Sequence, residues 1–157
     1  MRIIFVTLFS FAFVSIGLFS GIMLTLIAIL QKQWNKMVGI EYLVYFKGFL
    51  QVAKGNIIVS VLTFTSFLLP FGIAIFGTKF INVNSALLFA SGLIFFAGCF
   101  LVTVFQNLPI YDEVVNWNEI SEKENWVAIR EKFFYLNIIR FFSSLISLLV
   151  LSMSLFI

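Results

Sequence analysis

The chain has 157 residues, of which 62% are hydrophobic and 18% are aromatic, while only 11% carry a charge. A water-soluble domain has about 25% charged residues, so this chain lacks the polar side chains needed to cover a surface that faces water. It has no histidine and a single cysteine, Cys99. Haem, di-iron and copper sites built on histidine are therefore excluded, as is an intrachain disulfide, and no metal or other cofactor is predicted.

Four apolar segments are predicted to cross a membrane, because about 20 apolar residues span a hydrocarbon core of roughly 30 Å. They cover residues 3–30, 57–76, 81–110 and 134–157. Each is continuously apolar, which favours helices over the alternating strands of a membrane barrel. The first segment is about twice as long as the apolar part of a signal peptide, so it is interpreted as a span. The sequence predicts an all-α, integral membrane four-helix bundle forming one domain over residues 1–157.

The first predicted span contains a Gly-x-x-x-Gly pair, Gly17 and Gly21. Small residues at this spacing let two helices approach closely. We expect the pair to serve ordinary helix packing within the chain.

A short amphipathic helix is predicted between the first two spans. Its apolar face carries Tyr42, Phe46, Phe49 and Ala53, and its polar face carries Lys47, Gln51 and Lys54. Such a helix lies on the bilayer surface or leads into the second span. A simple interfacial anchor is the favoured interpretation, and a surface that binds a partner is the alternative.

Basic residues predict the orientation, since cytoplasmic connections are enriched in lysine and arginine. Eight of the ten flank the two long connections: Lys32, Lys36, Lys47, Lys54, Lys123, Arg130, Lys132 and Arg140. Both long connections are therefore expected in the cytoplasm and both termini outside, in a multi-pass protein of the cell membrane. This topology and the lipid bilayer explain the net charge of +3, so no nucleic-acid partner is predicted.

The polar chemistry of the chain is concentrated where the third span ends and the fourth begins. Asn107 and Pro109 close the third apolar segment, and an acidic loop follows from Asp112 to Glu124. Six residues then share an arc of about 120° on one helix face: Trp126, Arg130, Phe133, Phe134, Asn137 and Arg140. Polar residues at membrane depth are candidates for function. Structural roles are the alternative, namely arginines that reach lipid phosphates, an interfacial tryptophan and an asparagine that caps a helix end.

This arrangement resembles the anthrone-oxygenase-like family of small four-span bacterial membrane proteins, most of whose members belong to a domain of unknown function. The resemblance consists of Asn-x-Pro-[Leu/Ile] closing the third span, an acidic loop, and Trp-x3-Arg-x3-aromatic-x2-Asn-x2-Arg opening the fourth. The matching residues are Asn107, Pro109, Trp126, Arg130, Phe134, Asn137 and Arg140. Tyr111 stands where the family usually has asparagine, which alters a polar contact expected at that point.

The resemblance implies a small apolar aromatic substrate, such as an anthrone, that is oxidised without a metal or flavin. In that reaction Arg130 or Arg140 would stabilise an oxyanion, and Tyr111 or Asp112 would take the proton. The implied substrate-binding residues are Asn107 and Asn137, which would orient the oxyanion, together with Pro109, Trp126 and Phe134.

A non-catalytic role is the competing hypothesis. The chain would then be an accessory subunit or scaffold of a membrane complex, associated with another membrane protein or with further copies of itself. An aromatic-lined pocket beside Asn107, Trp126, Arg130 and Asn137 would favour an enzyme, whereas a closed interior would favour the scaffold.

Overall fold

The computed structural model describes residues 1–37, 39–117 and 126–156, and every regular element in these ranges is helical. In chain order the elements are α1 (Arg2–Thr25), the π-helical turn η1 (Leu26–Leu30), α2 (Gln31–Trp34), α3 (Ile40–Ala53), α4 (Ile57–Phe76), α5 (Ser85–Phe95), the π-helical turns η2 (Phe96–Leu101) and η3 (Thr103–Asn107), α6 (Leu108–Val115) and α7 (Trp126–Met153). The all-helical prediction is confirmed for the described residues.

Four helical stretches are long and apolar enough to cross a membrane: Arg2–Trp34, Ile57–Phe76, Ser85–Val115 and Trp126–Met153. The second has the predicted bounds. The first and third extend beyond the predicted spans toward the two long connections, and the fourth begins earlier than predicted. Helical hydrogen bonding continues through polar residues until a break interrupts it, so the apolar pattern underestimates the length of a helix.

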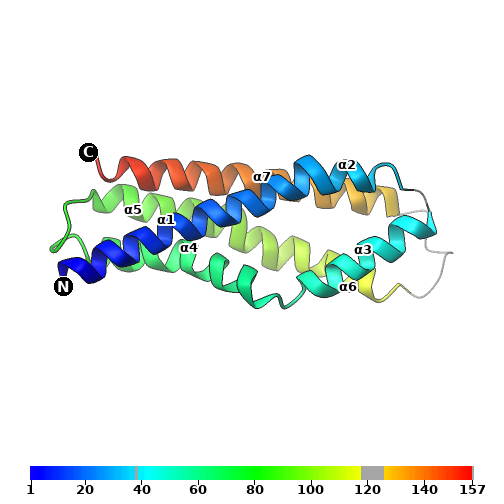
Figure 1. Ribbon diagram of the computed structural model, residues 1–157, viewed down its shortest axis with the longest axis horizontal. Helices are drawn as coiled ribbons and strands as arrows, with labels where there is room; N and C mark the ends of the chain where they lie inside the picture. Colours follow the sequence, from blue (N-terminus) through cyan, green and yellow to red (C-terminus); the bar gives the residue numbers. More distant parts are fainter. Residues whose placement is uncertain (38, 118–125, 157) are drawn as a thin grey trace.

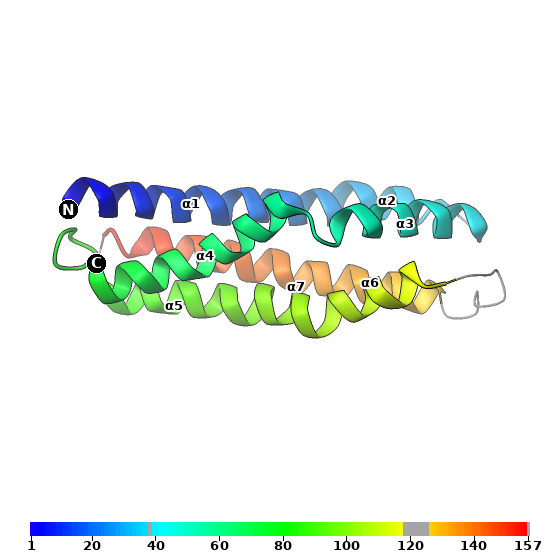
Figure 2. The ribbon, with the colours of Figure 1, turned by 90° about the horizontal axis from the view of Figure 1, so that it is seen from below.

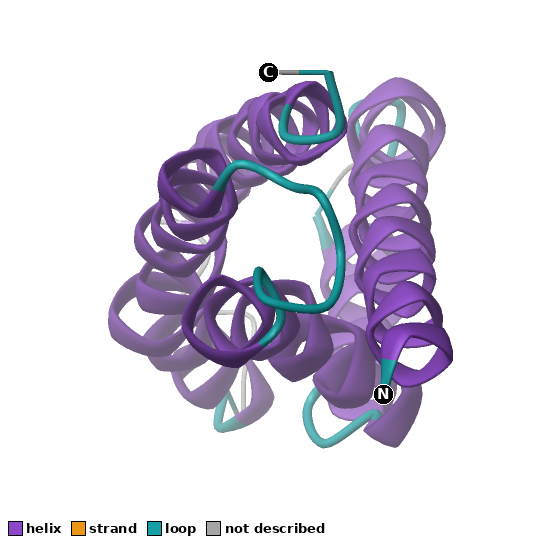
Figure 3. Cartoon of the chain, turned by 90° about the vertical axis from the view of Figure 1, so that its left-hand side faces the viewer, coloured by secondary structure: helices purple, strands orange, loops and turns teal. Residues whose placement is uncertain are grey.

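The four stretches pack side by side around one axis. α1 and α5 each contact both α4 and α7, and the end-on view shows this cyclic arrangement (Figure 3). The start of α1 and the end of α7 lie at the same end of the bundle, and α2, the end of α6 and the start of α7 lie at the opposite end (Figure 1).

Small residues bring some helices close together, but they are not the predicted pair. A side chain at Gly98 would collide with Ser143 of α7, and one at Gly92 would meet the ring of Phe71 at 2.8 Å. Gly17 and Gly21, in contrast, have nothing within 4 Å of the place a side chain would occupy. The expectation that this pair serves helix packing is therefore wrong, because both glycines face open space.

The predicted amphipathic helix is α3, and it runs along the bundle rather than across its end (Figure 2). Its buried side chains are Tyr42, Phe46 and Leu50. The ring of Phe46 lies 5.3 Å from that of Trp34 and 5.2 Å from that of Phe133. The apolar face of α3 thus packs on protein, which the interpretation as a simple interfacial anchor did not anticipate.

α3 and α4 are separated by a break at residues 54–56. Gly55 adopts φ +88°, a backbone conformation that other L-residues rarely adopt. Asn56 then begins α4, because its side-chain oxygen accepts hydrogen bonds from the amides of Ile58 and Val59, each at 3.1 Å. One side of the bundle is consequently formed by two successive helices, α3 and α4.

Candidate functional site

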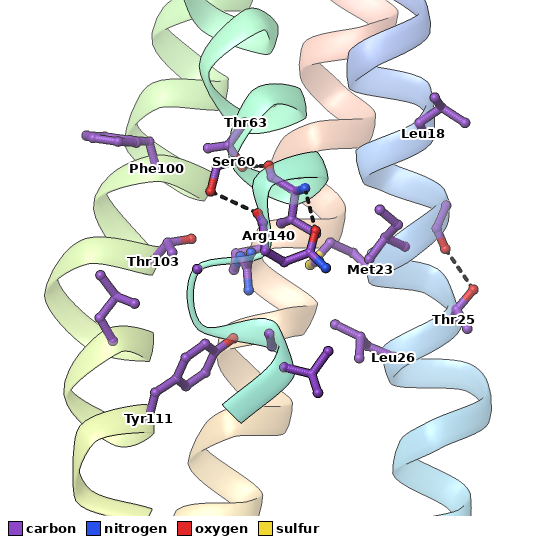
Figure 4. Close-up of a pocket in the computed structure, with 18 of the residues that line it drawn as sticks. Leu18, Met23, Thr25, Leu26, Ser60, Thr63, Phe100, Thr103, Tyr111 and Arg140 are labelled. Carbon is purple, nitrogen blue, oxygen red and sulfur yellow. Dashed lines mark hydrogen bonds between the residues drawn. The ribbon is translucent and has the colours of Figure 1, made fainter. Parts of the chain in front are cut away.

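A mainly apolar cavity of about 860 Å³ lies beside the break between α3 and α4 (Figure 4). Its walls come from α1 and η1, from α3, α4 and the break between them, from η2, η3 and α6, and from one residue of α7. The lining includes Gly17, Gly21, Met23, Leu26, Phe49, Gly55, Val59, Phe64, Phe100, Val104, Tyr111 and Arg140.

Local backbone features create this space. The break shifts α3 relative to α4, and the two glycines of α1 contribute no side chains to fill the gap. Residues of all three π-helical turns line the cavity, among them Leu30, Phe100 and Thr103. A π-helical turn inserts an extra residue into a helix, and such turns are frequent at functional sites.

Arg140 of α7 is the charged residue of the cavity lining, and it is only 3% exposed. A terminal nitrogen of its guanidinium donates a hydrogen bond to Oδ1 of Asn137 at 3.1 Å. Its Cζ lies 5.3 Å from the centre of the Phe19 ring, and its Nε has no partner. The backbone is held too, because Sγ of Cys99 donates to the Arg140 carbonyl at 3.2 Å. Asn137 is thus placed to position Arg140.

Tyr111 of α6 is the second predicted site residue in the cavity wall. It is 8% exposed, and its ring centre lies 6.0 Å from that of Phe133. Figure 4 shows its hydroxyl group directed into the cavity on the side of Arg140. A guanidinium and a phenol therefore face the same apolar space.

The other hydroxyl groups of the wall are bound to their own helices. Thr25 donates to the carbonyl of Gly21 at 2.9 Å, and Thr103 donates to that of Cys99 at 2.7 Å. Ser60 and Thr63 of α4 make the same type of bond, four residues back along their helix. Their donor hydrogens are used locally, whereas the guanidinium of Arg140 offers five N–H donors, of which the Nε–H has no partner among the described residues.

Arg130, the other predicted oxyanion ligand, lies in a different environment. Its Cζ is 4.8 Å from the Trp126 ring centre and 5.5 Å from that of Tyr42. It also donates to the carbonyl of Trp34, the last residue of α2, at 3.2 Å. This arginine joins α7 to α2 and α3, and neither it nor Trp126 lines the cavity.

The remaining predicted residues are also separate from the cavity lining. Asp112 is exposed and forms an ion pair with Lys54. Pro109 is exposed in the first turn of α6, and Phe134 is half-buried. Asn107 is fully buried, and its side-chain nitrogen and oxygen have no hydrogen-bond partner in the described ranges. The predicted acidic positions from Glu119 to Glu124 lie outside the described residues.

The structure therefore divides the predicted cluster. The face of α7 that carries Phe133, Asn137 and Arg140 does point into the protein, but Arg140 and Tyr111 alone among the predicted catalytic and substrate-binding residues line the cavity. Sequence reasoning missed the wall formed by Gly17, Gly21 and the α3–α4 break. The sequence signal for the break is Gly55 followed by Asn56, a helix stop followed by a helix cap.

Comparisons of the chain with protein-family models, with curated proteins and with solved structures find no match. The resemblance to the anthrone-oxygenase-like family thus stays a prediction. The function is argued from the geometry of the cavity.

Proposed function

We propose that the chain is a multi-pass membrane protein that binds a small apolar ligand in the cavity beside Arg140. Insertion in a bilayer is supported by the outer surface of the four apolar stretches. Large apolar side chains point away from the protein there, for example Phe11 at 55% exposure, Phe105 at 71% and Ile75 at 61%. Water contact at such a surface is unfavourable, whereas contact with lipid tails is not.

The proposed orientation places the long connections in the cytoplasm of the cell and both termini outside. Lys32, Lys36 and Lys54 are exposed on the half of the molecule that holds these connections. Basic residues on that side follow the positive-inside rule.

The cavity is the observation that carries the ligand-binding proposal. Its volume of about 860 Å³ lies within the range of roughly 300–1,000 Å³ typical of small-molecule sites. The wall is mainly apolar, with Phe49, Phe64, Phe100 and Tyr111 as its aromatic members. These features suit a flat aromatic molecule.

Within the family resemblance, the proposed reaction is oxidation of an enolisable aromatic ketone by O₂ without a metal. One anthrone and one O₂ give one anthraquinone and one water: a CH₂ carbon becomes a carbonyl carbon, and the second oxygen atom leaves as water. Arg140 would stabilise the enolate oxygen, and Tyr111 would take the proton that leaves the CH₂ carbon. Asp112 is not assigned a role, because it forms a surface ion pair.

A cavity-filling variant tests ligand binding. Gly21→Phe adds a ring to the cavity wall at a position where a Cβ atom meets nothing within 4 Å. Gly72→Leu is the control: its position is equally open but lies outside the cavity wall. With the protein in lipid nanodiscs, 9-anthracenemethanol should bind to the wild type and to Gly72→Leu, and lose affinity about tenfold or more in Gly21→Phe, as expected when a site is occupied by a side chain. Equal binding to all three variants would contradict the proposal.

The accessory-subunit hypothesis is the second candidate, and one observation favours it. Arg130, Trp126 and Tyr42 form a packed cluster away from the cavity, which gives these predicted site residues a structural role. This hypothesis expects a larger complex after mild detergent extraction, with another membrane protein or further copies of the chain. Native mass spectrometry tests it, and a monomer without partners would contradict it.

A further inference from the structure

We propose that the cavity selects an apolar monoanion, a molecule with one oxyanion group on an otherwise apolar body, and that Arg140 pairs with that group. This inference rests on the proposed ligand binding and adds the charge of the ligand. A carboxylate on an aromatic ring system and a fatty acid share the required chemistry.

The first argument is the electrostatic state of Arg140. Arginine stays protonated in proteins, and a buried charge without a counter-ion is costly. Arg140 is 3% exposed, lines the cavity, and has an unpartnered Nε. Within the part of the chain that the structure describes, the ion pair formed is that of Lys54 with Asp112. An oxyanion in the cavity would supply the counter-ion.

The second argument is the start of α4. Gly55 and Asn56 lie in the cavity wall, so this 20-residue helix begins at the cavity. The N-terminus of a helix carries a partial positive charge, and broken membrane helices use such ends to hold anionic groups. The two sources of positive potential, Arg140 and the start of α4, come from separate segments and act on the same space.

The third argument is the hydrogen-bonding capacity of the wall. The hydroxyl groups of Thr25, Thr63 and Thr103 donate to carbonyls of their own helices. Arg140, Tyr111 and the side-chain amide of Asn56 are left to provide donors for a ligand. A guanidinium with free N–H groups matches the paired oxygens of a carboxylate, so a ligand with one such group is favoured over a neutral ligand.

Matched acid and alcohol probes test the charge of the ligand. The wild-type chain in nanodiscs of neutral lipid is titrated at pH 8 with 9-anthracenecarboxylate and 9-anthracenemethanol, and in parallel with dodecanoate and dodecanol, with empty nanodiscs as the blank. The acid of at least one pair should bind about tenfold or more tightly than its alcohol, because a hydrogen bond to a charged group is stronger than one between neutral groups. The pair with the tighter acid distinguishes an aromatic source from a fatty acid.

Arg140→Gln should reduce the preference for the acid to about twofold or less while the alcohol still binds, since the charge is removed and much of the volume is kept. Arg140→Lys should keep part of the preference. If acid and alcohol bind the wild type equally, or if Arg140→Gln retains the preference, the inference is overturned while ligand binding stands. If no probe binds above the blank, both proposals are overturned. The acid-to-alcohol ratio of the wild type decides the question even where a variant fails to fold.

Discussion

Two arginines on one face of α7 have different environments. Arg130 lies between the rings of Trp126 and Tyr42 and donates to a backbone carbonyl, so its charge is stabilised by protein groups. Arg140 has one ring beside it and one amide hydrogen bond, and it faces a cavity. The same residue type on the same face can therefore serve packing at one position and ligand binding at another.

The environment of Tyr42 allows a prediction about the stability of the protein. Its side chain is fully buried, and its hydroxyl group has no hydrogen-bond partner among the described residues. Tyr42→Phe removes an unsatisfied buried group and should raise the free energy of unfolding by about 1 kcal/mol at pH 7. Thermal unfolding in detergent measures this change. A loss of stability of the same size would show that the hydroxyl group makes a favourable contact.

The same residue predicts a pH dependence. Burial raises the pKa of Tyr42, and the positive charge of Arg130 lowers it to a smaller extent. The phenol stays neutral in the folded protein while it ionises near pH 10 in the unfolded chain. Ionisation of this group therefore leaves the free energy of unfolding unchanged below about pH 10 and lowers it as the pH rises further. The loss of stability between pH 8 and pH 11 should be smaller in Tyr42→Phe than in the wild type. Tyr45→Phe is the control, because that side chain is 59% exposed.

At the scale of the helices, small polar residues fix the distance between α7 and its neighbours. Ser91 and Ser147 each donate to the carbonyl of the other, at 2.8 and 2.9 Å. Ser20 of α1 donates to Oγ of Ser144 at 2.8 Å. Such bonds between membrane helices contribute about 0.6 kcal/mol on average, so close packing of the backbones provides most of the stability.

Gly98 tests the importance of this close packing. Gly98→Ala places a methyl group against Cβ and Oγ of Ser143, atoms too near the backbone to move away. We expect a loss of about 1–3 kcal/mol in the free energy of unfolding, the usual cost of overpacking. Ser143→Gly should compensate, because the remaining Cα lies 3.8 Å from the added methyl group. A double-mutant cycle measures the coupling, with Gly72→Ala as a control in open space. Independent effects of the two substitutions would contradict the proposed contact.

At the scale of the whole molecule, the arrangement of the helices has a direct topological consequence. Four apolar stretches that alternate in direction bring the start of α1 and the end of α7 to one end of the molecule (Figure 1). α2, α3 and α6 all lie toward the other end, where Lys47 of α3 donates to the carbonyl of Trp117 at 2.9 Å. This end forms a packed extension of the bundle beyond the start of α4.

Cysteine labelling checks the proposed orientation. Cys99 is buried, so Cys99→Ser provides a background without accessible thiols. Asn82→Cys lies between α4 and α5, and Asn116→Cys lies after α6; both positions are exposed. A membrane-impermeant maleimide should label position 82 in intact cells and position 116 only after permeabilisation. The reverse pattern would invert the orientation, and labelling of both positions in intact cells would contradict the proposed four crossings.

The sequence alone predicts the helices, the second apolar stretch with its bounds, and the polar and aromatic face of α7. These features depend on local hydrogen bonding and on the period of apolar residues, which are properties of neighbouring residues. It misassigned Gly17 and Gly21, because a Gly-x-x-x-Gly pair looks the same whether it faces a helix or an open space. Only the tertiary structure decides that point.

The cavity itself is a tertiary property. Gly21, Asn56, Tyr111 and Arg140 come from separate segments, and no local pattern brings them together. The shortage of charge in the composition indicates a membrane-type chain. It also bears on Arg140, because a buried cation in an apolar wall needs a counter-ion. The sequence predicts that such an arginine lies on a polar and aromatic face of α7, directed to the bundle interior or to the lipid headgroups. The break between α3 and α4 and the unfilled glycine positions decide that it faces a space large enough for a ligand.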